Sequence, residues 1–162
     1  MLLYLRHGDD RGDDAYKHDR PLNDRGRKKA RKTFAELAER YGHPDTLVVS
    51  PFRRGLQTLE AMAAEFRRPV DVHRDPRVSQ YLGGKRSPVV SPETAAVIDL
   101  DESLGSFRKR VLDHVEDVRR RHARGSAIWC VTHQVVIEEV ATHFGVKIAG
   151  ELDFLDHVVA LG

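Results

Sequence analysis

Residues 46–58, with the sequence TLVVSPFRRGLQT, contain an apolar run, a turn and the start of an amphipathic helix. The run at 46–49 is typical of a strand buried on both faces. Ser50 is a good N-cap residue, and Pro51 suits the first helical position. The apolar residues that follow recur at helical spacing: Phe52, Leu56, Leu59, Ala63 and Phe66. This stretch therefore predicts a strand that leads directly into a helix packed on a sheet.

The same alternation continues along the rest of the chain. Residues 2–5 (LLYL) and 127–131 (AIWCV) are predicted to be buried strands, with weaker strands at 70–72 and, as a possible C-terminal edge strand, 158–161. Helical spacing covers three more stretches, which are residues 24–41, 107–124 and 136–144. Alternating strands and helices predict an α/β fold, a three-layer α/β/α sandwich with a mostly parallel sheet and helices on both faces.

Composition favours one globular domain over residues 1–162, with 40% hydrophobic and 32% charged residues. No apolar run reaches the length of a bilayer span, and the N-terminal MLLYLRHG is too short and too soon charged for a secretory segment. The single cysteine, Cys130, cannot form an internal disulfide and is interpreted as a core residue. These features predict a cytoplasmic protein without membrane partners.

Polar clusters follow three of the predicted strands. They are residues 6–7, 50–54 and 132–134, and each begins where an apolar run ends. Because the carboxyl ends of parallel strands share one edge of the sheet, where such folds bind ligands, we expect these clusters to converge there.

Two arginines stand where a helix start disfavours them. Arg53 and Arg54 fall in the first turn of the helix after the second strand, at the positive end of the helix dipole. A bound anion would restore the balance, and the planar guanidinium fork suits phosphate. The sequence therefore predicts a phosphate site.

The histidines indicate what happens to that phosphate. A neutral imidazole at His7 is a competent nucleophile and would form a covalent phosphohistidine. Arg6, Arg54 and a protonated His133 would neutralise the phosphoryl oxygens, and water would complete the hydrolysis. Since the guanidinium groups supply the positive charge, this scheme needs no metal and no cofactor.

Several segments resemble the histidine phosphatase superfamily, whose members include cofactor-dependent phosphoglycerate mutases and small phosphohistidine phosphatases of bacterial phosphorelays. Residues 5–8 (LRHG) resemble its RHG signature, and residues 50–58 resemble its S-x-x-x-R-A-x-Q-T segment. Three further segments are similar to the family's RPLT-type segment, the entry to a later helix and the strand end with the second histidine: residues 20–26, 102–111 and 131–133.

The resemblance implies roles for individual residues. His7 would be the nucleophile, Arg6 and Arg54 phosphate ligands, and His133 the second histidine. The same segments supply candidates for substrate binding, which are Gly8, Asn23 and Gln134. The implied substrate is a phosphorylated protein or a small phosphorylated metabolite.

The chain departs from the family where a proton donor is expected. Gln80 stands where many members have a glutamate, and Gln134 stands where another branch has an acid. The donor is left open, with Asp9, Asp10 and Glu93 as candidates. A phosphohistidine substrate needs less help for its leaving group, which together with the short chain favours the small phosphorelay-type phosphatases.

Other functions remain open at this point. One is a phosphate- or phosphopeptide-binding module of the same fold that has lost turnover, and another is a phosphoglycerate mutase-like phosphotransferase. A third is a metal-dependent hydrolase or a nucleic-acid binder, using the acidic residues of 9–19 or the basic residues of 20–32. The third is least favoured because charge runs are usually solvated helix faces. The sequence does not predict an oligomeric state.

Overall fold

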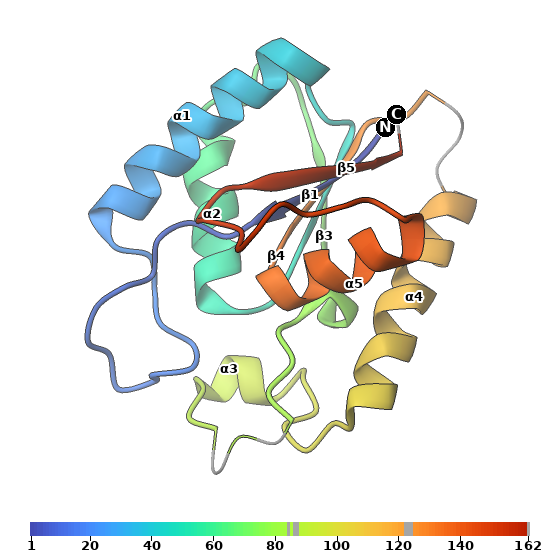
Figure 1. Ribbon diagram of the computed structural model, residues 1–162. Helices are drawn as coiled ribbons and strands as arrows, with labels where there is room; N and C mark the ends of the chain where they lie inside the picture. The colour runs from blue at the N-terminus through green and yellow to red at the C-terminus, as the bar shows by residue number, and fades with distance from the viewer. Residues whose placement is uncertain (84, 86–87, 122–124, 162) are drawn as a thin grey trace.

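The computed structural model of the chain describes residues 1–83, 85, 88–121 and 125–161. Its sheet has five strands in the order β3-β2-β4-β1-β5 (Figure 1). The first four are mutually parallel, and β5 pairs antiparallel with β1 at the edge. The strands are β1 (Leu2–Arg6), β2 (Thr46–Val49), β3 (Asp71–Arg74), β4 (Ile128–Thr132) and β5 (His157–Leu161). The mostly parallel sheet and the C-terminal edge strand are thus confirmed.

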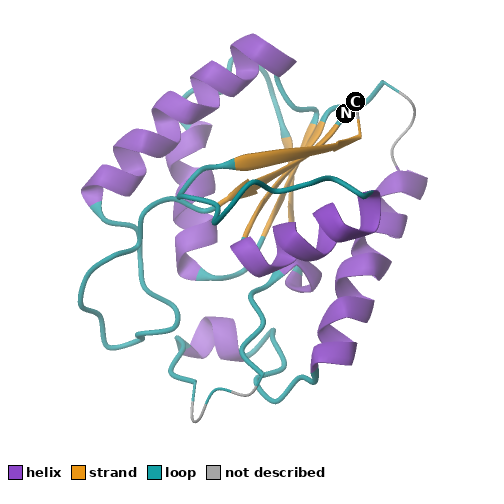
Figure 2. Ribbon diagram, in the orientation of Figure 1, coloured by secondary structure: helices purple, strands orange, loops and turns teal. Residues whose placement is uncertain are grey.

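Helices cover both faces of this sheet, which confirms the three-layer arrangement (Figure 2). One face is covered by α1 (Asp24–Tyr41) and α2 (Arg53–Ala63), and the other by α4 (Leu104–Arg121) and α5 (Gln134–Phe144). A 3-10 turn, η1 (Pro76–Val78), and the short helix α3 (Pro92–Ala95) lie between β3 and α4 in the sequence. In the described part of the chain, no helix has both the length and the apolar character that crossing a bilayer requires.

The strands bury alternate residues on opposite faces, as a period of two requires. In β1, Leu3 and Leu5 pack toward α1 and α2, whereas Leu2 and Tyr4 pack toward α4 and α5. Trp129 and Cys130 of β4 divide in the same way, and both are fully buried. The two apolar layers fix the register of the central strands, and thereby the positions of the residues that follow them.

The start of α2 corrects one prediction. The helix begins at Arg53, so Ser50 is not its N-cap and Pro51 is not its first residue. Phe52 occupies the N-cap position, and its side chain has no hydrogen-bond acceptor. The Arg53 N–H instead donates to the Asp19 carboxylate at 2.8 Å. Because this acceptor lies 34 residues away, the cap is a tertiary contact that no local pattern could reveal.

Smaller differences concern element limits. The third strand spans Asp71–Arg74 rather than 70–72. The helix predicted over 107–124 is α4, which begins earlier, at Leu104, and residues 122–124 lie outside the described residues.

Two irregular segments are joined at the site edge of the sheet. His18 N donates to Val89 O at 3.0 Å, and Val89 N donates back to His18 Nδ1 at 2.9 Å. The fully buried Asp19 accepts hydrogen bonds from the hydroxyls of Ser91 and Thr94. The loop after β1 is therefore held against the segment that leads into α3.

The close approach of this loop to α1 gives a first prediction. A Cβ at Gly26 would lie 2.8 Å from Asp9 N and closer still to Asp9 O, so the backbone would have to shift. Gly26→Ala should lower the free energy of unfolding by about 1–3 kcal/mol in urea denaturation, the usual cost of overpacking. The control is Gly105→Ala in α4, where the nearest atom is 3.8 Å from the new Cβ, and it should cost nothing. Equal stability of the two variants would contradict the packing described.

Candidate active site

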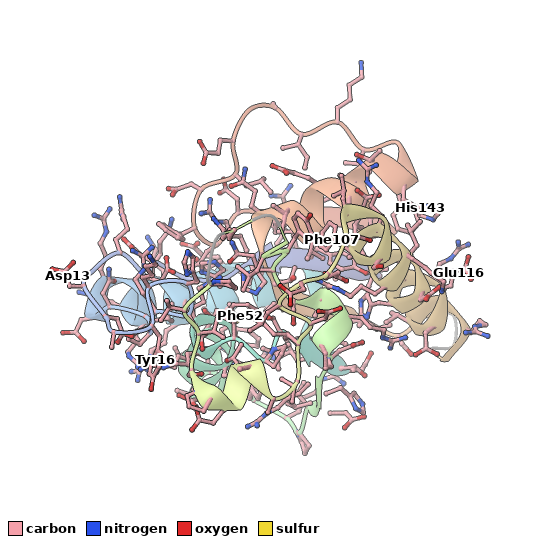
Figure 3. The ribbon with its side chains drawn as sticks, turned by 90° about the horizontal axis from the view of Figure 1, so that it is seen from below. Asp13, Tyr16, Phe52, Phe107, Glu116 and His143 are labelled. Atoms are coloured by element: carbon pink, nitrogen blue, oxygen red, sulfur yellow. The ribbon has the colours of Figure 1, made fainter. Side chains whose placement is uncertain are left out.

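A cavity of about 330 Å³ lies at the carboxyl edge of β1, β2 and β4. Figure 3 views the molecule from below Figure 1, with Phe52 near the centre, between Tyr16 on the loop after β1 and Phe107 on α4. The predicted convergence of the polar clusters is met, because the cavity takes residues from all three. Its described lining comprises Arg6, His7, Asp10, Lys17, His18, Arg20, Arg54, Gln80, Lys85, His133, Gln134 and Val135.

His7 follows β1 directly and is held from both sides. Its Nδ1 lies 2.8 Å from Gly8 O, which can only accept, so Nδ1 carries the hydrogen. The other nitrogen, Nε2, therefore has the lone pair, and it accepts from Arg54 Nε at 3.1 Å. Burial first, and then the Arg54 guanidinium, hold the pKa of His7 well below its usual value. The imidazole is thus neutral, with its nucleophilic nitrogen facing the central cation.

Arg54 forms hydrogen bonds with four lining residues of the cavity although it is only 3% exposed. Besides His7, its guanidinium donates to His18 O at 2.9 Å, to Gln80 Oε1, and at 3.3 Å to His133 Nδ1. Burial lowers the pKa of Arg54 to about 10, which leaves it protonated at neutral pH. A buried cation thus lies beside the imidazole lone pair.

His133 lies beside His7, and their ring centroids are 5.1 Å apart. Its Nε2 is 2.8 Å from Ser50 Oγ, and its Nδ1 accepts from Arg54. Burial, followed by the charge of Arg54, places the pKa of His133 well below its usual value. Without a ligand the His133 ring is therefore neutral, because a cation and a low dielectric both favour the neutral form. A protonated His133 beside a bound phosphoryl group stays a prediction.

Arg6 reaches the cavity from the end of β1. One terminal nitrogen donates to Gln134 Oε1 at 3.0 Å and to Leu152 O. The guanidinium carbon lies 4.5 Å from the centre of the Phe154 ring. Its Nε is buried and has no hydrogen-bond partner among the described residues. Arg6 is thus oriented by its neighbours and retains an unused donor.

The substrate-binding candidates divide into two groups. Gln134 lines the cavity, and its amide also donates to Glu138 at 2.7 Å. Gly8 and Asn23 are not among the lining residues. Gly8 N donates to Thr58 Oγ1 at 2.9 Å, and Asn23 caps α1 through Gly26 N. Gly8 and Asn23 therefore hold the elements around the cavity and do not face it.

Of the three carboxyl candidates, only Asp10 lines the cavity. Its Oδ2 lies 3.7 Å from Arg54 Nε and 3.8 Å from Arg20 Nε. Asp9 accepts from Arg11, whose hydrogen bonds hold the pKa of Asp9 at about 2. Glu93 is exposed on α3.

In the acidic loop of residues 9–19, considered above as a possible metal site, aspartates bind other protein groups. Asp14 pairs with Arg53, and Asp19 binds the start of α2 and two hydroxyls. Within the described ranges, no three His, Cys, Asp or Glu side chains are grouped so that they could hold a metal ion.

Several residues of the site were not predicted. Lys17, His18 and Lys85 line the cavity but belong to segments without periodicity, so no pattern placed them there. Ser50 and Thr58 lie in a segment that the sequence did single out, and each holds a site residue. Leu56 and Leu59 are only half-buried, because the inner face of α2 carries Arg54 and Thr58 instead.

The fold and the cavity together define an α/β/α protein with a cationic, histidine-containing pocket. The sequence profile of the histidine phosphatase superfamily (branch 1) matches residues 2–84, slightly more than half of the chain. The chain therefore belongs to the histidine phosphatase superfamily. No curated protein sequence shows a significant match to it.

Solved structures share the fold at low sequence identity. The protein histidine phosphatase SixA, complexed with tungstate, is 21% identical, with a TM-score of 0.60 over 86% of this chain and 74% of its own. A mycobacterial glucosyl-3-phosphoglycerate phosphatase, complexed with VO3, is 18% identical, with a TM-score of 0.70 over 96% and 88%. The ecdysone phosphate phosphatase of Bombix mori, also with tungstate, is 14% identical, with a TM-score of 0.69 over 96% and 86%.

Thr58 provides a prediction about how the site is held. Its hydroxyl accepts from Gly8 N and donates to Arg54 O at 2.7 Å, which joins the loop of His7 to the helix of Arg54. Thr58→Val keeps the shape but leaves the buried Gly8 N–H without a partner, at a cost of about 1–3 kcal/mol in the free energy of unfolding.

Thr58→Ser is the matched control. It keeps the hydroxyl and removes one methyl group, so it should be the more stable of the two variants in the same denaturation experiment, with a loss of about 0.8 kcal/mol. A valine variant as stable as the serine variant would show that the hydrogen bond does not hold the two elements together.

Proposed function

We propose that this protein is a metal-independent phosphatase that hydrolyses a phosphohistidine protein or a small phosphomonoester through a covalent phosphohistidine at His7. The observation that carries the proposal is the His7 Nε2 lone pair, 3.1 Å from the Arg54 guanidinium inside a closely lined cavity. Superfamily membership supports it, as do the fold neighbours, which include a protein histidine phosphatase and a glucosyl-3-phosphoglycerate phosphatase.

Binding replaces the direct contact between Arg54 and His7. The phosphorus atom comes to lie against His7 Nε2, while the phosphoryl oxygens accept from the guanidinium groups of Arg54 and Arg6. The unused Nε of Arg6 gains a partner. Arg54 lowers the pKa of His133, whereas a dianion beside the ring raises it. Nδ1 then takes up a proton and donates it in a hydrogen bond to the phosphoryl oxygens.

Transfer then proceeds in two steps. His7 Nε2 attacks phosphorus and forms a P–N bond, while the bond from phosphorus to the leaving oxygen or nitrogen breaks. Asp10, the carboxylate on the cavity wall, binds a proton together with the substrate and delivers it to the leaving group. Water next attacks the phosphohistidine, Asp10 accepts its proton, and phosphate leaves with His7 restored. The guanidinium groups stabilise the charge on the phosphoryl oxygens throughout.

A second candidate is a phosphate-binding module of the same fold without turnover. It is favoured by Gln80, whose amide contacts Arg54 and cannot donate a proton as a carboxylic acid does. Steady hydrolysis of 4-nitrophenyl phosphate, whose leaving group hardly needs protonation, excludes this candidate.

The phosphatase proposal predicts a labelled intermediate on one histidine. The protein mixed with a ³²P-labelled phosphomonoester and denatured in alkaline detergent, where a P–N bond survives, should carry the label on His7. His7→Ala should remove the label and lower kcat for 4-nitrophenyl phosphate by at least about a thousandfold, because the nucleophile is lost.

The control is His143→Ala. His143 is exposed near the end of α5, far from Phe52 in Figure 3, and its loss should leave the labelling intact. Label that persists in His7→Ala, or turnover that survives in it, would defeat the assignment of His7.

A further inference from the structure

More positive charge lines the cavity than one phosphoryl group requires. Beyond Arg6 and Arg54, the described lining includes Lys17, Arg20 and Lys85. Within the described residues, neither lysine side chain has a carboxylate within 4.0 Å. Arg20 Nε lies 3.8 Å from Asp10 Oδ2, and Arg54 contacts the same carboxylate. The Nε of Arg20 is buried and has no hydrogen-bond partner among the described residues.

These cations come from two parts of the chain, residues 17–20 and residue 85. His18, next to Lys17, exchanges two hydrogen bonds with Val89. After burial, the charges of Lys85 and Lys17 are the next causes that lower the pKa of His18. Because Val89 N donates to Nδ1, the neutral His18 ring carries its hydrogen on Nε2. We name Lys17, His18, Arg20 and Lys85 the outer group.

The outer group adjoins the phosphoryl site on the side of Arg54. The guanidinium of Arg54 donates to His18 O at 2.9 Å, and the Asp10 carboxylate lies between Arg54 and Arg20. A ligand with its phosphoryl group on His7 and Arg54 therefore extends past His18 toward the two lysines. The same cavity contains both parts.

Counting charges shows what the ligand must supply. Five cationic side chains and one carboxylate are among the described lining residues, while His7 and His133 are neutral. A phosphomonoester dianion neutralises two of the four excess charges, which leaves two without a partner. Unpaired charge in a partly enclosed cavity favours a ligand with a further anionic group.

We propose, on the basis of the proposed function, that the substrate is a small phosphate ester with a second anionic group, bound by the outer group. The size of the cavity, about 330 Å³, is at the lower end of the range for small-molecule sites. Lys17, Arg20 and Lys85 all line this one cavity, where a small ligand is within reach of each.

The test compares two substrates that differ in one charge. They are 4-carboxyphenyl phosphate and its uncharged carboxamide, and the readout is the ratio of their kcat/KM values. We expect a ratio of about ten or more for the unmodified protein, because the carboxylate gains a charge-assisted contact. The double variant Lys17→Met, Lys85→Met should bring the ratio close to one. Lys109→Met, on an exposed site of α4, is the control and should keep the original ratio.

The outcomes separate the two proposals. If neither substrate is hydrolysed and no label reaches His7, the phosphatase function itself fails. If both are hydrolysed with a ratio near one that the lysine variants do not change, the phosphatase stands and the second anionic group is excluded. If an acidic phosphohistidine protein is the only substrate whose hydrolysis depends on Lys17 and Lys85, the outer group binds a protein and the small-molecule proposal is overturned.

Discussion

The buried guanidinium of Arg54 is the constraint on which the rest of the site depends. Its donors face an imidazole, a backbone carbonyl, an amide and a second imidazole, all of them neutral, and its nearest carboxylate, Asp10, is 3.7 Å away and shared with Arg20. The positive end of α2 adds to the excess. Burying an incompletely neutralised ion costs on the order of several kcal/mol. A bound phosphoryl dianion would relieve this cost, which is the physical basis of the proposed function.

The fold holds this cation in place through contacts between residues that are far apart in the sequence. Adjacent strands β1 and β4 bring His7 and His133 to one edge, and the apolar residues on both faces of the sheet set that register. Thr58 joins the loop of His7 to α2, and Asp19 caps the same helix from the other side of the site. The hydrogen bonds and the packing that hold the cation are thus already present without phosphate. The cavity is preorganised for an oxyanion.

The sequence allowed the strands, the main helices and the convergence of the three polar clusters to be predicted, because each depends on local apolar periodicity. The cap of α2 could not be predicted, since Asp19 and Arg53 meet only in the folded chain. Nor could Lys17, His18 and Lys85, which belong to segments without periodicity. That His133 is neutral without a ligand could not be predicted, because burial and Arg54 act on it together, and its protonation beside a bound phosphate stays a prediction. The single-domain organisation and the cytoplasmic location stay predictions.

In the two proposals, Arg6 and Arg54 hold the phosphoryl group that reacts, and the outer group holds the second anionic group of the substrate. The central claim, that phosphorus replaces the direct contact between Arg54 and His7, is tested most directly by a crystal structure with orthovanadate. The account predicts vanadium bonded to His7 Nε2, with its oxygens on the Arg54 guanidinium. Vanadate bound elsewhere, with the 3.1 Å contact between Arg54 Nε and His7 Nε2 intact, would contradict it.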